Sequence, residues 1–134
     1  MTVNGSNRLQ MILAFLWMLL LGLDIWLSLS PGVTPPYKFE QSDKFYHTGM
    51  YFLLSLLPFV YSINITKATF LSLISLMVGI ILECMQFFVP FREFSIMDIC
   101  ANELGILLGI IVGVRIRRYL FGKGIIYVLS SSLF

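Results

Sequence analysis

Long apolar runs alternate with short polar or proline-containing breaks along the chain, which is the pattern of a protein with several membrane spans. Four such runs occupy residues 9–29, 45–63, 68–89 and 96–114. A helix needs about 20 apolar residues to cross the hydrocarbon of a bilayer. The pattern therefore predicts an all-α integral membrane protein with four transmembrane helices, forming one domain over residues 1–134.

The breaks between the runs carry residues that end helices. A segment rich in proline follows the first run over residues 30–42, a polar turn covers residues 61–67, and Pro90 stops the third run. The apolar stretch within residues 119–134 is too short to span and is predicted to lie at the membrane interface or to fray.

Composition excludes a soluble globular domain. The chain is 58% hydrophobic and 12% charged, whereas soluble proteins carry roughly 25% charged residues. The few basic residues flank the apolar runs instead of forming a patch, so we expect the lipid bilayer as partner and no nucleic acid. Cys84 and Cys100 fall in or beside the predicted spans, and we predict them to be buried free thiols.

The distribution of lysine and arginine predicts the orientation. With four spans, both termini share one side with the turn at residues 61–67, and cytoplasmic loops carry an excess of basic residues. The side of the termini holds Arg8, Lys67, Arg115, Arg117, Arg118 and Lys123, and the opposite side holds Lys38, Lys44 and Arg92. Both termini are therefore predicted to be cytoplasmic.

Polar residues gather at the extracytoplasmic ends of three predicted helices. They recur at helical spacing on one face of each helix: Asp43, His47 and Tyr51 on the second, Glu83 and Gln86 on the third, and Asp98 and Asn102 on the fourth. Because these helix ends lie on the same side of the membrane, the polar groups are expected to form one layer. Gly105, Gly109 and Gly113 continue the fourth face and are expected to let another helix pack closely.

This layer has a structural and a functional interpretation. In the structural one, Arg92 neutralises Glu83 or Asp98 and the amides tie the helices together. An interhelical hydrogen bond contributes only about 0.6 kcal/mol on average, whereas an intramembrane carboxylate costs on the order of 3 kcal/mol, which favours a functional site. Asp24 and Glu103 are weaker candidates, because Asp24 stands near the outer boundary and Glu103 points away from the polar face.

The residue types suggest roles within this site. His47, Glu83 and Asp98 are the candidates for acid, base or metal ligand, although no residue pattern decides whether the chain is an enzyme. The candidate binding residues are Asp43, Lys44, Gln86, Arg92 and Asn102. No spacing matches a metal signature such as H-E-x-x-H, so neither a metal site nor another cofactor is predicted, and a divalent metal is the less favoured interpretation.

The order of these motifs resembles that of the VanZ-like family of small bacterial membrane proteins. The resemblance rests on D-K-x-x-H from Asp43, E-x-x-Q from Glu83, and R-x-x-S-x-x-D-x-x-x-N-x-x-G from Arg92. It implies a multi-pass protein of the bacterial plasma membrane, and the named member of the family is associated with resistance to the glycopeptide antibiotic teicoplanin. Glu103 is a departure from the motif.

Three functions are consistent with these features. The first is a site that binds or modifies a lipidic or lipid-linked component of the cell envelope, with Arg92 attracting an anionic head group. The second is a non-enzymatic scaffold or assembly factor whose polar layer is structural. The third, a proton-coupled carrier, is disfavoured because the cytoplasmic halves of the helices hold no polar path beyond small hydroxyl residues such as Ser72 and Ser75.

Overall fold

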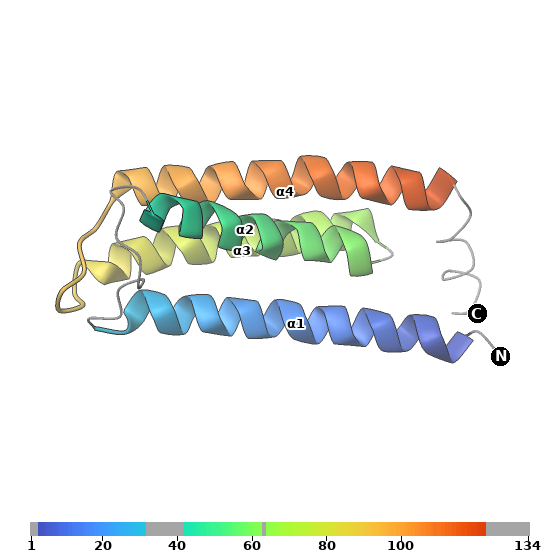
Figure 1. Ribbon diagram of the computed structural model, residues 1–134, viewed down its shortest axis with the longest axis horizontal. Helices are drawn as coiled ribbons and strands as arrows, with labels where there is room; N and C mark the ends of the chain where they lie inside the picture. Colours follow the sequence, from blue (N-terminus) through green and yellow to red (C-terminus); the bar gives the residue numbers. More distant parts are fainter. Residues whose placement is uncertain (1–2, 32–41, 63, 123–134) are drawn as a thin grey trace.

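The computed structural model describes residues 3–31, 42–62 and 64–122 as four helices side by side (Figure 1). They are α1 (Val3–Leu29), α2 (Ser42–Tyr61), α3 (Ile65–Gln86) and α4 (Ile96–Gly122). The ends of α1 and α3 lie beside the starts of α2 and α4 at one end of the bundle. The all-α prediction is confirmed.

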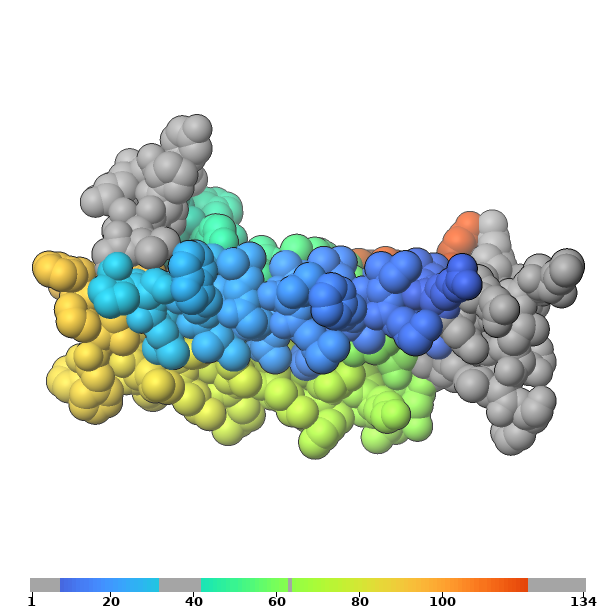
Figure 2. All heavy atoms as spheres, turned by 90° about the horizontal axis from the view of Figure 1, so that it is seen from below, coloured from blue at the N-terminus to red at the C-terminus, as the bar shows by residue number. Residues whose placement is uncertain are grey.

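Three helices are long and apolar enough to cross a membrane, over Arg8–Leu29, Ile65–Gln86 and Ile96–Leu120. The less apolar helix, α2, packs against each of the other three. Large apolar side chains such as Ile12, Phe70 and Leu107 stay exposed on the outside, whereas Ser55 and Ser72 are fully buried. Figure 2 shows the outer face along α1. This arrangement, apolar outside with small polar groups inside, is that of a bundle whose solvent is lipid.

The observed helix ends differ from the predicted ones. α3 begins at Ile65, three residues before the predicted start, because the side chain of Asn64 accepts hydrogen bonds from the N–H groups of Thr66 and Lys67 at 2.8 and 3.3 Å. It ends at Gln86 instead of residue 89, since tighter hydrogen bonds from the N–H groups of residues 88 and 89 form a turn there. Glu83 therefore lies in the last helical turn instead of deeper in the span.

The first, second and fourth helices also differ at their ends from the predicted spans. α1 begins before residue 9, and α2 begins at Ser42, before the predicted residue 45, and ends at Tyr61. α4 continues past residue 114 to Gly122, so the predicted interfacial tail starts within a helix. The rest of that tail, residues 123–134, and most of the proline-rich connection, residues 32–41, fall outside the described residues.

A glycine seam joins α4 to α2. A Cβ on Gly109 would lie 2.6 Å from the carbonyl oxygen of Phe52, and one on Gly105 would meet the carbonyl oxygen of Thr48. The hydroxyl of Ser55 donates to the carbonyl of Ile106 at 3.0 Å across the same contact. The predicted close packing on this glycine face is therefore present, and its partner is α2.

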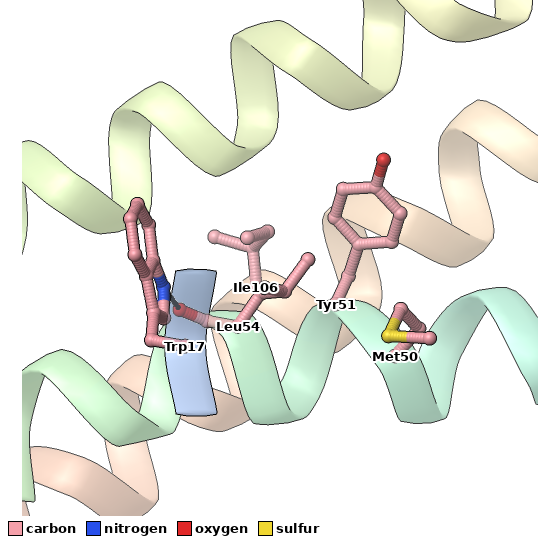
Figure 3. Packing of buried hydrophobic residues seen from close by; sticks show 5 residues of the cluster. All are labelled: Trp17, Met50, Tyr51, Leu54 and Ile106. Carbon is pink, nitrogen blue, oxygen red and sulfur yellow. Dashed lines mark hydrogen bonds between the residues drawn. The ribbon is translucent and has the colours of Figure 1, made fainter. Parts of the chain in front are cut away.

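A second contact fastens α1 to α2 at Pro58. Proline has no N–H, so the carbonyl of Leu54 lacks its ordinary donor four residues later. The indole N–H of Trp17 donates to this carbonyl at 2.8 Å, and both side chains belong to the buried apolar cluster (Figure 3). A tryptophan of α1 thus satisfies the backbone group that the proline of α2 leaves open.

We predict that Gly109→Ala destabilises the bundle, because the added methyl group collides with the α2 backbone. Overpacking of this kind costs roughly 1–3 kcal/mol. The free energy of unfolding in detergent micelles measures the effect. Gly49→Ala is the matched control, since a Cβ at Gly49 meets no atom within 4 Å, and equal stability of the two variants would contradict the seam.

We also predict that Trp17 and Pro58 are energetically coupled. Trp17→Phe should cost about 1–3 kcal/mol more than its lost packing, because it leaves the Leu54 carbonyl buried without a donor. In a Pro58→Ala background the restored N–H supplies that donor, so the cost of Trp17→Phe should fall. A double-mutant cycle on unfolding free energies measures the coupling, and a coupling of zero would refute this explanation.

Candidate functional site

His47 is the centre of the polar layer. Its Nδ1 lies 3.0 Å from Oδ1 of Asn102 and 3.7 Å from Oε1 of Glu83, and its Nε2 lies 3.9 Å from Oδ1 of Asp43. These partners come from α2, α3 and α4. The predicted meeting of three helix ends is thus observed around one imidazole.

The oxygens around Nδ1 favour one tautomer of His47. Both Asn102 Oδ1 and Glu83 Oε1 are acceptors, so a proton on Nδ1 is favoured and donates to Asn102. In the neutral imidazole this leaves the lone pair on Nε2, the nitrogen on the Asp43 side. His47 therefore presents a base or ligand atom away from the amide that holds it.

Two carboxylates of the layer are buried with an unsatisfied oxygen. Glu83 is 1% exposed and Asp98 is 6% exposed. Among the described residues, neither Glu83 Oε2 nor Asp98 Oδ1 has a hydrogen-bond partner. Buried polar oxygens without a hydrogen-bond partner are costly, so these two oxygens need an explanation beyond the contacts within the described residues.

Asp24 belongs to the same end of the bundle, as its predicted place near the outer boundary implies. It is 5% exposed, and the hydroxyl of Tyr51 donates to its Oδ2 at 2.8 Å. Figure 3 shows the Tyr51 hydroxyl pointing away from the apolar side chains of Leu54 and Ile106. The signal in the sequence was Tyr51 itself, which continues the face of His47 and needed a polar partner.

Arg92 makes a contact that the structural interpretation does not include. Its Nη2 donates to the carbonyl of Leu27 at 2.7 Å, in the last turn of α1, where unsatisfied carbonyls attract a cation. Among the described residues, neither Glu83 nor Asp98 forms an ion pair with Arg92. Among the described residues, the hydrogen bond recorded for Arg92 therefore joins the α3–α4 connection to α1.

The remaining candidates lie around this centre. Gln86 is buried in the last turn of α3, and Lys44 is half-buried in the first turn of α2. No described residue forms a hydrogen bond or ion pair with the Lys44 side chain. Glu103 is exposed, as its position on the helix predicted. Cys84 and Cys100 are free but exposed, so their predicted burial is wrong; both stand on outward faces of apolar helices.

The connection from α3 to α4 carries exposed aromatic rings beside the layer. Phe87, Phe88 and Phe91 are 74%, 82% and 89% exposed, and the first two rings contact edge to face with centroids 5.3 Å apart. Aromatic side chains at the end of an apolar bundle are typical of the membrane–water interface. The polar layer and these exposed rings therefore lie at the same end of the bundle.

A comparison of the sequence with known families agrees with these motifs. The sequence model of the VanZ/LLP1 family matches residues 9–117. The chain belongs to the VanZ/LLP1 family. The match includes every residue of the polar layer and agrees with the resemblance to the VanZ-like family. Neither the search of curated proteins nor the search of solved structures found a match to this VanZ/LLP1 protein.

We predict that Tyr51→Phe destabilises this VanZ/LLP1 protein by about 1–3 kcal/mol, because it removes the donor to the buried Asp24 carboxylate. Unfolding free energy in detergent is the measurement. Tyr46→Phe serves as the control, since Tyr46 is 46% exposed. If both substitutions had the same small effect, the Tyr51–Asp24 hydrogen bond would not contribute to stability.

Proposed function

We propose that the polar layer around His47 binds or modifies a lipidic or lipid-linked component of the bacterial cell envelope. The observation that carries the proposal is the pair of buried carboxylates, Glu83 and Asp98, each with an oxygen that lacks a partner within the described chain. A layer that only fastened helices would pair these oxygens, because unpaired ones cost stability.

The proposal includes a topology. α2 is the fourth span, although its composition is less apolar, because α1, α3 and α4 pack against it. Its 20 residues extend about 30 Å, the thickness of the hydrocarbon. Both termini face the cytoplasm of the bacterial plasma membrane, as the lysine and arginine distribution favours. The polar layer then opens toward the cell envelope.

The position of the layer supports a lipidic partner over a soluble one. The exposed rings of Phe87, Phe88 and Phe91 insert into the interface and hold the layer at head-group depth. A lipid that diffuses in the membrane reaches this depth without leaving the bilayer. In this proposal Arg92 and Lys44 provide positive charge for an anionic head group, and Gln86 and Asn102 provide hydrogen bonds.

His47 has the geometry of a general base in this proposal. Asn102 holds its Nδ1–H, and Nε2 is oriented to accept a proton from a bound hydroxyl or water. Asp98 and Glu83 lie beside it as carboxylates that can donate or accept the same proton. The same groups would serve binding without reaction, so binding is the minimal form of the proposal.

The second candidate function is a scaffold, and the contacts of Asp24 and Arg92 favour it. Tyr51–Asp24 joins α2 to α1, and Arg92–Leu27 joins the α3–α4 connection to α1. Both are structural links within the layer. A scaffold predicts that every substitution in the layer acts through the amount of folded protein.

We predict that Glu83→Gln and Asp98→Asn abolish function at unchanged protein abundance, because each removes a charge while keeping the shape of the side chain. The measurement is teicoplanin susceptibility of a sensitive bacterial host that expresses each variant, with membrane abundance quantified in the same cultures. The choice of teicoplanin rests on the family resemblance. Glu103→Gln is the matched control, because Glu103 is an exposed acid on α4.

Wild-type protection that is lost in Glu83→Gln and Asp98→Asn but kept in Glu103→Gln is the expected result. Protection that follows abundance across all variants would replace the proposal with the scaffold. Full protection by both layer variants would exclude a role of the carboxylate charges.

A further inference from the structure

We propose that Asp43, His47 and Asp98 form a binding site for one divalent transition-metal ion, Zn²⁺ or Mn²⁺. One potential ligand atom of each residue lies within 4.8 Å of those of the other two. The site joins the first two turns of α2 to the first turn of α4. It stands on the chain's own donors and does not depend on the lipid proposal. An ion on Nε2 would take the place of the general-base role of His47 and leave the binding form of that proposal unchanged.

The spacing of the donors fits an ion after a small contraction. Ligands around a tetrahedral ion with bonds of about 2.1 Å lie roughly 3.4 Å from one another. Asp43 Oδ1 and His47 Nε2 are already 3.9 Å apart. Asp43 is half exposed at the helix start, so its side chain can turn inward without disturbing the core.

The environment of His47 prepares Nε2 as a ligand. A metal-binding histidine donates its other ring N–H to an oxygen, which fixes the tautomer and the ring orientation. Here Asn102 Oδ1 accepts from Nδ1 at 3.0 Å. The Glu83 carboxylate, whose Oε1 lies 3.7 Å from Nδ1, also favours a proton on that nitrogen. Asn102 and Glu83 are therefore outer residues that orient the ligand.

Asp98 has the features of a ligand and not of a helix cap. A carboxylate in a first helical turn commonly serves the free N–H groups there. In α4 the side chain and carbonyl of Ser95 already accept from the Asp98 N–H, at 3.3 and 3.2 Å. Asp98 is 6% exposed, and its Oδ1 has no partner among the described residues.

The charge of the layer also calls for a cation. Asp24, Glu83 and Asp98 are all buried at this end of the bundle. Within the described residues the one buried basic side chain is Arg117, which lies near the far end of α4 and donates to the carbonyl of Ser62. Arg92 is half-buried at the end of the bundle that holds the carboxylates, where its Nη2 donates to the carbonyl of Leu27. A bound divalent ion would offset the repulsion between carboxylates that share a region of low dielectric constant.

The donor set selects the kind of ion. One imidazole nitrogen with two carboxylate oxygens suits Zn²⁺ and Mn²⁺, whereas Mg²⁺ prefers oxygen ligands and gives up its water reluctantly. Three protein ligands leave coordination positions open for water or for the phosphate or carboxylate of a ligand. We therefore expect Mg²⁺ to bind more weakly than either transition metal.

The test measures metal binding by the purified full chain in detergent, with the affinity tag removed and with Cys84 and Cys100 changed to serine to exclude thiol binding. Electron paramagnetic resonance quantifies the free Mn²⁺ that remains during titration, and calorimetry measures Zn²⁺ and Mg²⁺. We expect saturation at one ion per chain, loss of this binding in His47→Gln and Asp98→Asn, and about 10- to 100-fold weaker binding in Asn102→Leu.

Two further variants make the result decisive. Asp43→Asn changes a half-exposed residue and leaves the core intact, so it must also weaken binding in a protein that elutes as a folded monodisperse species. Glu103→Gln must bind like the wild type. Absence of Zn²⁺ and Mn²⁺ binding by folded protein, or equal affinity in wild type, Asp43→Asn and Asp98→Asn, would overturn the site.

The outcome is separable from the proposed function, because no lipid or antibiotic takes part in the binding measurement. Metal binding without any effect on susceptibility would leave the metal site standing and remove the envelope function. Susceptibility that depends on Glu83 and Asp98 in a protein that binds neither Zn²⁺ nor Mn²⁺ would remove the metal site and keep the function.

Discussion

The close approach of α2 and α4 along the glycine seam is the constraint on which the polar layer depends. Gly105 and Gly109 bring the α4 backbone against the backbone of Thr48 and Phe52. That contact sets the depth of one helix relative to the other. His47 precedes the seam by one residue on α2, and Asn102 precedes Gly105 by one turn on α4, so the imidazole and the amide meet because the two backbones do. A larger residue in the seam would move the two helices apart, and the imidazole and the amide would no longer meet.

The contacts inside this bundle are those that hold helices together in apolar surroundings. Lipid is as apolar as leucine, so apolar side chains gain little by facing inward, and close packing and hydrogen bonds must hold the helices together. The serines of α2 and α3 donate hydrogen bonds across or along the helices. The indole N–H of Trp17 donates to the Leu54 carbonyl, which Pro58 leaves without a backbone donor. These contacts account for α2, the helix that is not apolar enough to count among the three candidate spans and that packs against each of the other three.

The sequence predicted the elements well because hydropathy and helical spacing are local signals. The apolar runs predicted four helices, and the spacing along each helix predicted inward faces for His47 and Asn102. The helix ends were less accurate because they depend on single hydrogen bonds, such as those that Asn64 accepts at the start of α3. The partner of Tyr51 could not be found in the same way, since Asp24 comes from a different helix and no spacing rule relates the two.

The difference between local spacing and contacts between helices also explains why the sequence carries no metal signature. Signatures such as H-E-x-x-H place two ligands on one helix at a fixed spacing. Here Asp43 and His47 share a helix, but Asp98 stands on another, and the distance between them in the sequence reflects the length of α3 and the connections. The helix axes, not the local sequence, bring the three donors together. A fold in which α2 and α4 start at the same depth gives their first turns a common centre, and the dipoles of both helices stabilise the carboxylates there. The burial of Asp98 at this centre is then a consequence of the seam, and its unsatisfied oxygen is what a cation would complete.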